Sequence, residues 1–288
     1  MSAVRSGGTL PQTTGAIAPM GVTAVRSGGT PAPLDTPVPG LRGIGLEEMV
    51  DRAALLTRVD RKYVLRRAEV PAVLSGLDPA TRVLEVDGLR TQSYRSAYLD
   101  TDDLAGYRSA ATRRRRRFKV RTRTYADSDL SYLEVKTRGP RGHTVKERRI
   151  RTVGGSTTGP LDASERDWVD SLLVPLGCPP GTAGGLVPVL EVTYGRTTLL
   201  MGDGCGRATI DSGLEWVAPG RGSLTRPDLV IVETKSGSRP SDLDHLLWAC
   251  GHRPTRISKY ATALAALDDT LPANRWARVL RQEFTTAC

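Results

Sequence analysis

The sequence predicts an α+β protein built on one large antiparallel sheet or barrel. Two observations support this fold class. About eight segments alternate between apolar and polar residues and are separated by Gly, Pro, Asp and Ser turns, which is typical of β-strands. The segments with helical periodicity are few and short, so we expect helices that flank a sheet rather than a helical bundle.

The expected elements follow from the periodicity of each segment. The strands are expected at residues 58–65, 92–100, 118–125, 131–137, 144–151, 187–198, 206–211 and 229–235. The helices are expected at residues 46–56, 67–77, 164–173, 241–250 and 259–267. Ser164 is expected to open the third helix, and Pro71 is expected in the first turn of the second.

The chain of 288 residues divides into three parts by composition. Residues 1–40 are rich in Gly, Pro, Ser and Thr, and the segment 3–9 recurs at 24–30, which predicts a disordered tail. One folded domain is expected over residues 41–270. Residues 271–288 are expected to form a C-terminal tail.

Composition also excludes several classes of protein. No window approaches 18 consecutive apolar residues and the N-terminus lacks a signal-peptide pattern, so a cytoplasmic location is expected. The four cysteines are widely spaced and only three histidines occur, which argues against a zinc site and against disulfides. The formal net charge is +10, with a pI near 9.8.

Charged side chains alternate onto one face of several expected strands. In the strand at 118–125, Lys119, Arg121 and Arg123 share a face. The corresponding charges of four further strands are Glu134 with Lys136, Lys146 with Arg148, Arg207 with Asp211, and Glu233 with Lys235. In a two-layer fold such charges are solvated. In a closed barrel covered by helices they line a polar lumen, which suits a polyanion and a divalent cation.

The positions of the lysines favour a polar lumen over a solvated face. Only six of the 41 basic residues are lysine. Four of these six, Lys119, Lys136, Lys146 and Lys235, lie on the charged faces, and Lys62 lies in the strand at 58–65. Arginine would serve a solvated face equally well, so the retained lysines indicate positions where a compact ammonium group matters.

Short motifs recur in a specific order along the chain. They lie at residues 60–63, 94–101, 119–125, 133–136, 146–148, 194–196, 210–211, 232–235 and 258–260. In order and spacing they resemble the VTC domain, the polyphosphate polymerase module of the vacuolar transporter chaperone family, within the CYTH or triphosphate tunnel superfamily. The resemblance covers residues 41–267.

The resemblance implies an eight-stranded antiparallel β-barrel tunnel with flanking helices. It also implies that the protein binds ATP and inorganic polyphosphate, requires Mn²⁺ or Mg²⁺, and extends polyphosphate with the terminal phosphoryl group of ATP. The basic residues that match phosphate-contacting positions divide into two groups. Those expected to be catalytic are Lys62, Arg121, Arg123, Lys136 and Lys235, and those expected to bind substrate are Lys146, Arg148, Arg196 and Lys259. Lys119 is added to the substrate-binding group from its place on the charged face, and Ser258 from its place before the last helix.

Three carboxylates are candidates for holding the metal. Glu233 matches the metal-binding glutamate of the family, and Glu134 and Asp211 are added because alternation directs them to the same lumen. Mg²⁺ and Mn²⁺ usually take one or two carboxylates together with substrate phosphates and waters, so metal binding is expected to depend on bound nucleotide. Tunnel triphosphatases begin with an E-x-E-x-K pattern, whereas residues 58–62 read Arg-Val-Asp-Arg-Lys, which favours the polymerase branch.

Other features have competing explanations. The arginine run at 113–117 lies either at the tunnel mouth, where it would guide polyphosphate, or in a solvated loop or nonspecific nucleic-acid patch. Tyr98, Tyr125 and Tyr194 are expected to pack in the fold rather than to stack on a base. His143 is expected to be a loop residue, because no carboxylate partner lies near it in the sequence.

Phosphoryl transfer needs alignment of the reactants and neutralisation of charge, which basic residues in a tunnel supply. The leading hypothesis is therefore an ATP-dependent polyphosphate polymerase. One alternative is a metal-dependent triphosphatase, which would release phosphate without chain growth. The other is a non-catalytic module that binds polyphosphate, inositol phosphates or nucleic acid. No specific nucleic-acid partner is expected, and any passage of polyphosphate through a membrane would require a separate membrane-protein partner.

Overall fold

The computed structural model describes residues 40–52, 59–128, 130–139, 142–151, 159–202, 204 and 206–284. The tail expected at residues 1–40 lies outside the described residues apart from Gly40, and so do residues 53–56 of the first expected helix. Within the described parts of the chain, no helix has the length and apolar character needed to cross a membrane.

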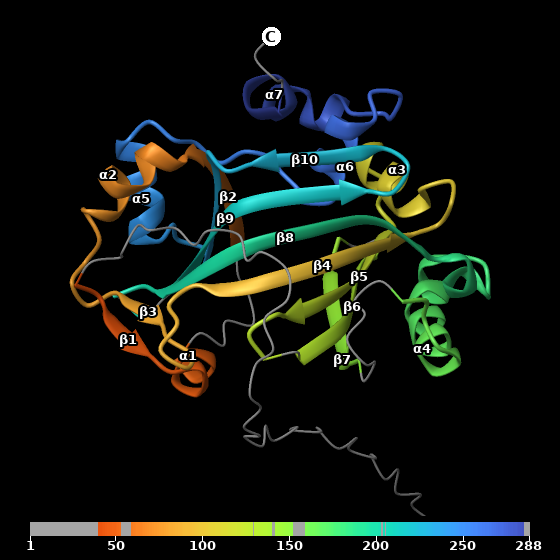
Figure 1. Cartoon of the computed structure of the whole chain (residues 1–288), viewed down its shortest axis with the longest axis horizontal. Helices are drawn as coiled ribbons and strands as arrows, with labels where there is room; N and C mark the ends of the chain where they lie inside the picture. The colour runs from red at the N-terminus through yellow and green to blue at the C-terminus, as the bar shows by residue number, and fades with distance from the viewer. Residues whose placement is uncertain are drawn as a thin grey trace, which may run out of the picture.

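The core of the fold is one antiparallel sheet with an eight-stranded main path (Figure 1). Its order is β2 (Val59–Arg66), β11 (Leu229–Ser236), β9 (Gly206–Ala218), β8 (Val187–Leu200), β4 (Gln92–Asp100), β5 (Arg117–Tyr125), β6 (Leu130–Arg138) and β7 (Thr144–Ile150). Three short strands extend it: β1 (Arg42–Ile44), β3 (Arg82–Leu84) and β10 (Gly222–Arg226). The predicted α+β class with an antiparallel sheet is confirmed.

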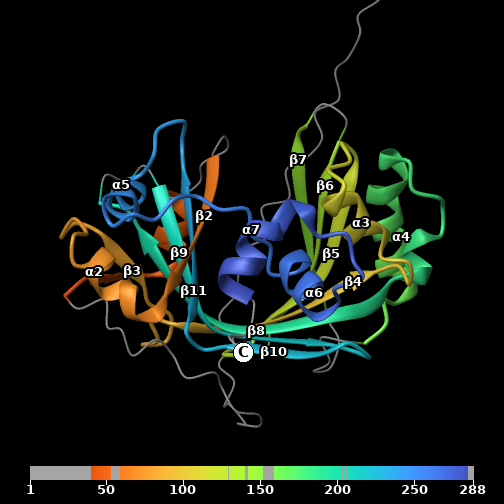
Figure 2. The same ribbon diagram turned by 90° about the horizontal axis from the view of Figure 1, so that it is seen from above.

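The sheet is strongly curled but is not closed into a complete barrel. In Figure 2 it forms a trough, with one wing made of β2, β9 and β11 and the other made of β5, β6 and β7. Among the described residues, the outermost strands β2 and β7 have no ladder between them. The expected closure is therefore incomplete. Figure 2 shows α6 and α7, from the C-terminal part of the chain, between the two wings.

The helices are short. They are α1 (Leu46–Arg52), α2 (Val70–Leu74), α3 (Ala105–Ala111), α4 (Ala163–Leu173), α5 (Asp242–Ala249), α6 (Ala261–Leu267) and α7 (Ala277–Val279). Single 3₁₀ turns lie at Arg67–Glu69, Val174–Leu176, Thr182–Gly185 and Asn274–Trp276, and a π-helical turn lies at Leu280–Phe284.

The convex face of the sheet is apolar and is covered by helices. On the β2 side, Tyr63 and Val232 pack with Val70 of α2 and Leu247 of α5. On the opposite wing, β5 and β6 bury an apolar cluster against α4. Figures 1 and 2 show α2 and α5 outside one wing and α4 outside the other. Because alternate residues of a strand point to opposite faces, burial of the apolar set on the outside directs the charged set inward.

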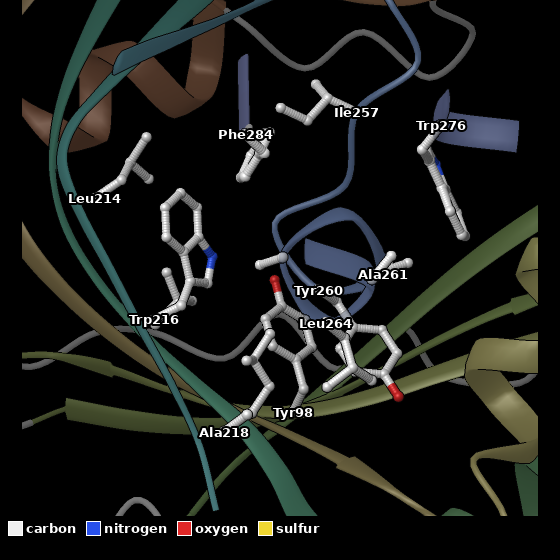
Figure 3. Close-up of a cluster of buried hydrophobic side chains, with 14 of the residues drawn as sticks. Tyr98, Leu214, Trp216, Ala218, Ile257, Tyr260, Ala261, Leu264, Trp276 and Phe284 are labelled. Atoms are coloured by element: carbon white, nitrogen blue, oxygen red, sulfur yellow. The ribbon is translucent and has the colours of Figure 1, made fainter. Parts of the chain in front are cut away.

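The C-terminal segment is part of the core, which corrects the tail expected at 271–288. Trp276, Val279 and Phe284 are buried in a cluster with residues of β9 and α6. Figure 3 shows Trp276 and Phe284 near α6, with Trp216 of β9 below them. The segment is short and carries several arginines, so it looks solvated in sequence, but the curled sheet offers its few apolar residues a surface to cover.

The expected elements agree with the structure in position and differ at some ends. All eight expected strands are present, and β9 continues beyond 211 to Ala218. β1, β3 and β10 were not expected. The cap of α4 is Asp162 rather than Ser164: the Asp162 carboxylate accepts a hydrogen bond from the backbone N–H of Glu165, whose side chain accepts one from the backbone N–H of Asp162.

Candidate functional site

The concave face of the sheet collects charged side chains from strands far apart in sequence. The strand register places them in one continuous surface, hereafter the concave face. Its charged members are Asp60 and Lys62 (β2), Glu233 and Lys235 (β11), Arg207 and Asp211 (β9), Arg196 (β8), Arg117, Lys119, Arg121 and Arg123 (β5), Glu134, Lys136 and Arg138 (β6), and Lys146 and Arg148 (β7). Alternation therefore assigned the charged residues to the correct face.

Glu134 is enclosed by basic groups from the same wing. It accepts hydrogen bonds from Nε of Arg121 at 2.6 Å and from Nζ of Lys146 at 2.7 Å. Arg123 lies at ion-pair distance, 3.9 Å from the same carboxylate. Burial would raise the pKa of Glu134, but the three basic groups outweigh it and hold this pKa well below its usual range. Glu134 is therefore a charged anchor that fixes the orientation of Arg121.

Asp211, at the centre of the sheet, is a second carboxylate that holds basic groups in place. Arg196 donates to it in a bidentate arrangement, with Nε 2.6 Å from one oxygen and Nη2 2.8 Å from the other. Lys259, which precedes α6, donates to the same carboxylate. The carboxylate is fully buried, yet its two basic partners keep its pKa well below the usual value.

Glu233 bridges two lysines on the other wing. Its carboxylate oxygens lie 3.0 Å from Nζ of Lys62 and 3.0 Å from Nζ of Lys235. Burial would raise the pKa of Glu233, but the two ammonium groups lower it well below its usual value. Burial would lower the pKa of Lys62, and the charge and hydrogen bond of Glu233 raise it instead.

The three carboxylates proposed as metal ligands do not converge. Each one is neutralised by its own set of basic groups, and the described part of the chain contains no group of three or more His, Cys, Asp or Glu side chains that could hold a metal ion. This donor set fits an ion that arrives with phosphate and water ligands and takes one protein carboxylate, rather than a resident metal held by the protein alone.

Lys119 and Lys136 differ from the basic residues described above, which are paired with carboxylates. They lie directly opposite one another on β5 and β6, and neither makes an ion pair with a described carboxylate. Lys119 donates to Oγ of Ser258 at 3.0 Å and lies over the rings of Tyr98 and Tyr260. Burial and the neighbouring basic groups lower its pKa well below the usual value. An anion bound beside Lys119 would favour the charged form of its amine.

A cavity of about 560 Å³ opens between the two wings at this point. It is lined by Lys62 of β2 and by Lys119 and Lys136 of the opposite wing. Ser258 and the preceding loop 254–257 complete one wall, and Trp276 of the C-terminal segment lies in another. The cavity thus brings together predicted residues from three parts of the chain.

Ser258 makes the helix-capping contact expected of it, and its role as a phosphate ligand stays a prediction. Its hydroxyl oxygen accepts a hydrogen bond from the backbone N–H of Ala261, in the first turn of α6, and from Nζ of Lys119. Because the side chain lines the cavity, it remains a candidate phosphate ligand beside Lys119. Arg148 lies in the exposed edge strand β7, and the carbon of its guanidinium group is 4.9 Å from the ring centroid of Tyr132.

The tyrosines of the concave face pack against one another. Tyr94 and Tyr194 stack with ring centroids 5.3 Å apart, and Tyr94 contacts Tyr125 at 4.9 Å. Tyr98 and Tyr194 are buried within the core cluster. The expectation that Tyr98, Tyr125 and Tyr194 are packing residues agrees with these contacts. His143 lies in the turn between β6 and β7 and is exposed.

Sequence reasoning missed several basic residues of the cavity. Arg138 continues the alternation of Glu134 and Lys136 by one more step, so the same pattern could have found it. Arg256 and Arg275 lie outside any strand, and Arg275 belongs to the segment that was expected to be a tail. Only the tertiary packing brings these two residues to the cavity.

Comparison with known proteins identifies the family. The family profile described as the VTC domain matches residues 57–153 and 182–268, which together make up more than half of the chain. The chain belongs to the VTC domain family. The matched segments contain every charged residue of the concave face, and the C-terminal segment at 274–284 lies beyond them. No curated protein matches this VTC domain chain.

Solved structures resemble this VTC domain only distantly. A Hippeastrum protein, described as a candidate adenylyl cyclase with a dominant triphosphatase activity, is 17% identical, with a TM-score of 0.48 over 76% of this chain and 100% of that one. A candidate adenylate cyclase from Vibrio parahaemolyticus is 13% identical, with a TM-score of 0.39 over 73% of this chain and 98% of that one. At these scores the likenesses carry no argument about activity.

Proposed function

We propose that this VTC domain is a polyphosphate polymerase that transfers the terminal phosphoryl group of ATP to an inorganic polyphosphate chain bound on the concave face. The observation that carries the proposal is the Lys119–Lys136 pair, two cross-strand ammonium groups without a carboxylate partner at the wall of the cavity. Membership of the VTC domain family supports the substrate class.

Several buried polar atoms of the concave face lack a hydrogen-bond partner. Nε of Arg123, Oγ of Ser96 and Oγ1 of Thr209 are buried and make no hydrogen bond among the described residues. Buried polar groups in folded proteins are almost always paired. Phosphate oxygens or ordered waters would supply the acceptors and donors that these three positions lack.

The residues of the chain would contribute binding, orientation and charge. Arg121, Arg196 and Lys62 are each fixed by a carboxylate, so their donors are held in place before substrate arrives. Such preorganised donors stabilise charge on a transferring phosphoryl group without reorganising during the reaction. Lys119 and Lys136 would add positive charge that no ion pair among the described residues neutralises, since Asp60 and Glu233 act on Lys136 without forming one.

The metal ion is expected to enter with the nucleotide. Glu233 is the proposed protein ligand, since it matches the glutamate implied by the family, and bound Mn²⁺ or Mg²⁺ would neutralise charge on the phosphates. The walls of the cavity would restrict water, which favours a phosphate chain end over water as the acceptor.

The direct test incubates the purified protein with ATP and Mn²⁺, with and without a short polyphosphate primer. Chain length is resolved on a gel while ADP and free phosphate are assayed. Long chains with matching ADP establish the polymerase. Free phosphate without chain growth contradicts it and indicates a triphosphatase, and neither product combined with tight polyphosphate binding indicates a non-catalytic module.

A further inference from the structure

Four arginines converge at the rim of the cavity. Arg117 and Arg138 are direct cross-strand partners at the ends of β5 and β6. Arg256 belongs to the loop before α6, and Arg275 belongs to the C-terminal segment. All four line the same cavity. We call these four residues the rim cluster.

The rim cluster holds its positive charges close together without a carboxylate. Like charges directly opposite one another on neighbouring strands are destabilising. Burial and the charges of Arg138 and Arg275 lower the pKa of Arg117. Burial and nearby arginines, Arg256 first among them, also lower the pKa of Arg275. Among the described residues, none of the four makes an ion pair, although the carboxylate-bearing residue Asp60 lines the same cavity.

Backbone carbonyls hold three of the guanidinium groups in place. Arg117 donates to the carbonyl of Arg114 at 3.0 Å, and Arg138 donates to that of Gly142 at 3.2 Å. Arg275 donates to the carbonyl of Ala110, at the end of α3, at 2.8 Å. A carbonyl orients a guanidinium group without neutralising its charge. The group therefore stays positively charged, and its remaining N–H donors can bind an external acceptor.

The rim cluster continues the row of charges inside the cavity. Along β5 and β6 the cross-strand pairs are Arg121 with Glu134, then Lys119 with Lys136, then Arg117 with Arg138. The carboxylate of the first pair is absent from the next two, so the uncompensated charge increases toward the rim. The four residue steps from Arg121 to Arg117 span roughly 14 Å, which is long enough for several linked phosphate groups rather than for one.

We propose that the rim cluster is a second phosphate-binding site, which holds the part of a linear polyphosphate chain that extends beyond Lys119 and Lys136. This inference rests on the proposed function and adds a chain-length preference to it. Arg275 lies beyond the residues that match the family, so the preference is supplied in part by the C-terminal segment of this chain.

Binding measurements test the inference without requiring turnover. Titration calorimetry compares inorganic triphosphate with a polyphosphate of tens of units, for the wild-type protein and for the double variant Arg138→Gln/Arg275→Gln. We expect the double variant to keep its affinity for triphosphate and to lose about tenfold in affinity for the long chain, because charge-assisted hydrogen bonds to the distal phosphates are gone. Thermal unfolding of the double variant verifies that it is folded.

Arg42→Gln/Arg95→Gln is the matched control, since both arginines are exposed away from the cavity and their loss removes the same two positive charges. Equal long-chain affinity in the double variant and the control overturns the inference. Equal binding of a single-stranded oligonucleotide and polyphosphate at the rim also overturns it, because the cluster is then a general polyanion patch. Wild-type protein that binds neither triphosphate nor polyphosphate contradicts the proposed function itself.

Discussion

Lys119 and Lys136 face each other across β5 and β6 on the concave face, without a carboxylate between them. Two residues further along the same strands, Arg121 faces Glu134 and is neutralised by it. The fold therefore contains both arrangements side by side: an ion pair that fixes a guanidinium group, and a like-charge pair that costs stability. Such a cost is expected where a ligand supplies the missing negative charge.

Replacing Lys119 should separate stability from binding. We expect Lys119→Met to raise the free energy of unfolding of the ligand-free protein by roughly 0.2–1 kcal/mol, because a like-charge cross-strand pair is removed. The same variant should bind inorganic triphosphate at least about tenfold more weakly, since a charge-assisted contact is lost. Chemical unfolding and calorimetry measure the two effects. A variant that is less stable and binds normally would show that Lys119 serves the fold.

Arg121 and Lys235 should matter for turnover more than for folding. We expect Arg121→Ala and Lys235→Ala each to lower the rate of polyphosphate synthesis by roughly 100- to 1,000-fold, as loss of a preorganised donor at a reacting group does. Steady-state ADP release measures the rate, and Arg95→Ala serves as the control on the other face of the sheet. Rates close to wild type in both variants would mean that these side chains do not touch the transferred phosphoryl group.

Glu233→Gln tests the expected link between metal and nucleotide. Mn²⁺ alone should give no measurable heat of binding with the wild-type protein, whereas Mn²⁺ with a non-hydrolysable ATP analogue should bind, because the phosphates complete the ligand set. In Glu233→Gln, ATP consumption should be lost while polyphosphate binding persists. Tight Mn²⁺ binding in the absence of nucleotide would contradict this arrangement.

Triphosphate affinity should fall as the pH rises through about 8. Burial lowers the pKa of Lys235 to about 8, and Glu233 offsets only part of that effect. Burial would raise the pKa of Tyr194, but Arg123, Arg196 and Lys259 outweigh it and lower this pKa to about 8. Burial also lowers the pKa of Lys146 to about 8, and Glu134 offsets only part of that effect. Above that pH the concave face loses the positive charges of Lys146 and Lys235 and gains the negative charge of Tyr194, so an anion binds more weakly.

One variant separates the contribution of Tyr194 to this pH effect from that of the lysines. Tyr194→Phe removes the phenol and leaves Lys146 and Lys235, so the fall in affinity above pH 8 should be shallower than in the wild-type protein, where all three groups titrate in this range. The ultraviolet absorbance of the phenolate, followed by titration, should show a transition near pH 8 in the wild-type protein alone. Identical pH profiles for the two proteins would remove Tyr194 from the explanation.

The C-terminal segment should be needed for stability. Trp276 is 4% exposed and packs in the same cluster as Trp216 and Tyr107. We expect Trp276→Ala to destabilise the protein by about 3–5 kcal/mol, the usual cost of deleting a buried aromatic side chain. Arg278→Ala, at an exposed position of the neighbouring helix, should change stability by less than about 0.5 kcal/mol. Equal stabilities in urea would show that the segment is a peripheral tail.

Much of this site could be predicted from the sequence because strand alternation is a local property. The period of two assigns Lys119, Arg121 and Glu134 to one face whatever their distant neighbours are. The apolar residues of the same strands then decide that this face is the concave one, since they are covered by α2, α4 and α5. Sequence motifs were also sufficient to indicate the VTC domain family, which the family profile confirms.

The distribution of the carboxylates could not be predicted in the same way. Alternation directs Glu134, Asp211 and Glu233 to one surface, but the distances between them depend on how strongly the sheet curls. In the folded protein each acid is engaged by basic groups from its own neighbourhood, so the three do not form one cluster in the described chain.

The sequence by itself determined the α+β class, the eight long strands and the face on which each charged side chain lies, because these depend on local periodicity and on the exclusion of apolar surface from water. Tertiary structure alone decided that the trough stays open between β2 and β7, that the segment around Trp276 fills part of it, and that Arg275 joins Arg117 at the rim. These outcomes depend on how residues distant in sequence pack around the curled sheet, and a local sequence pattern does not predict that packing.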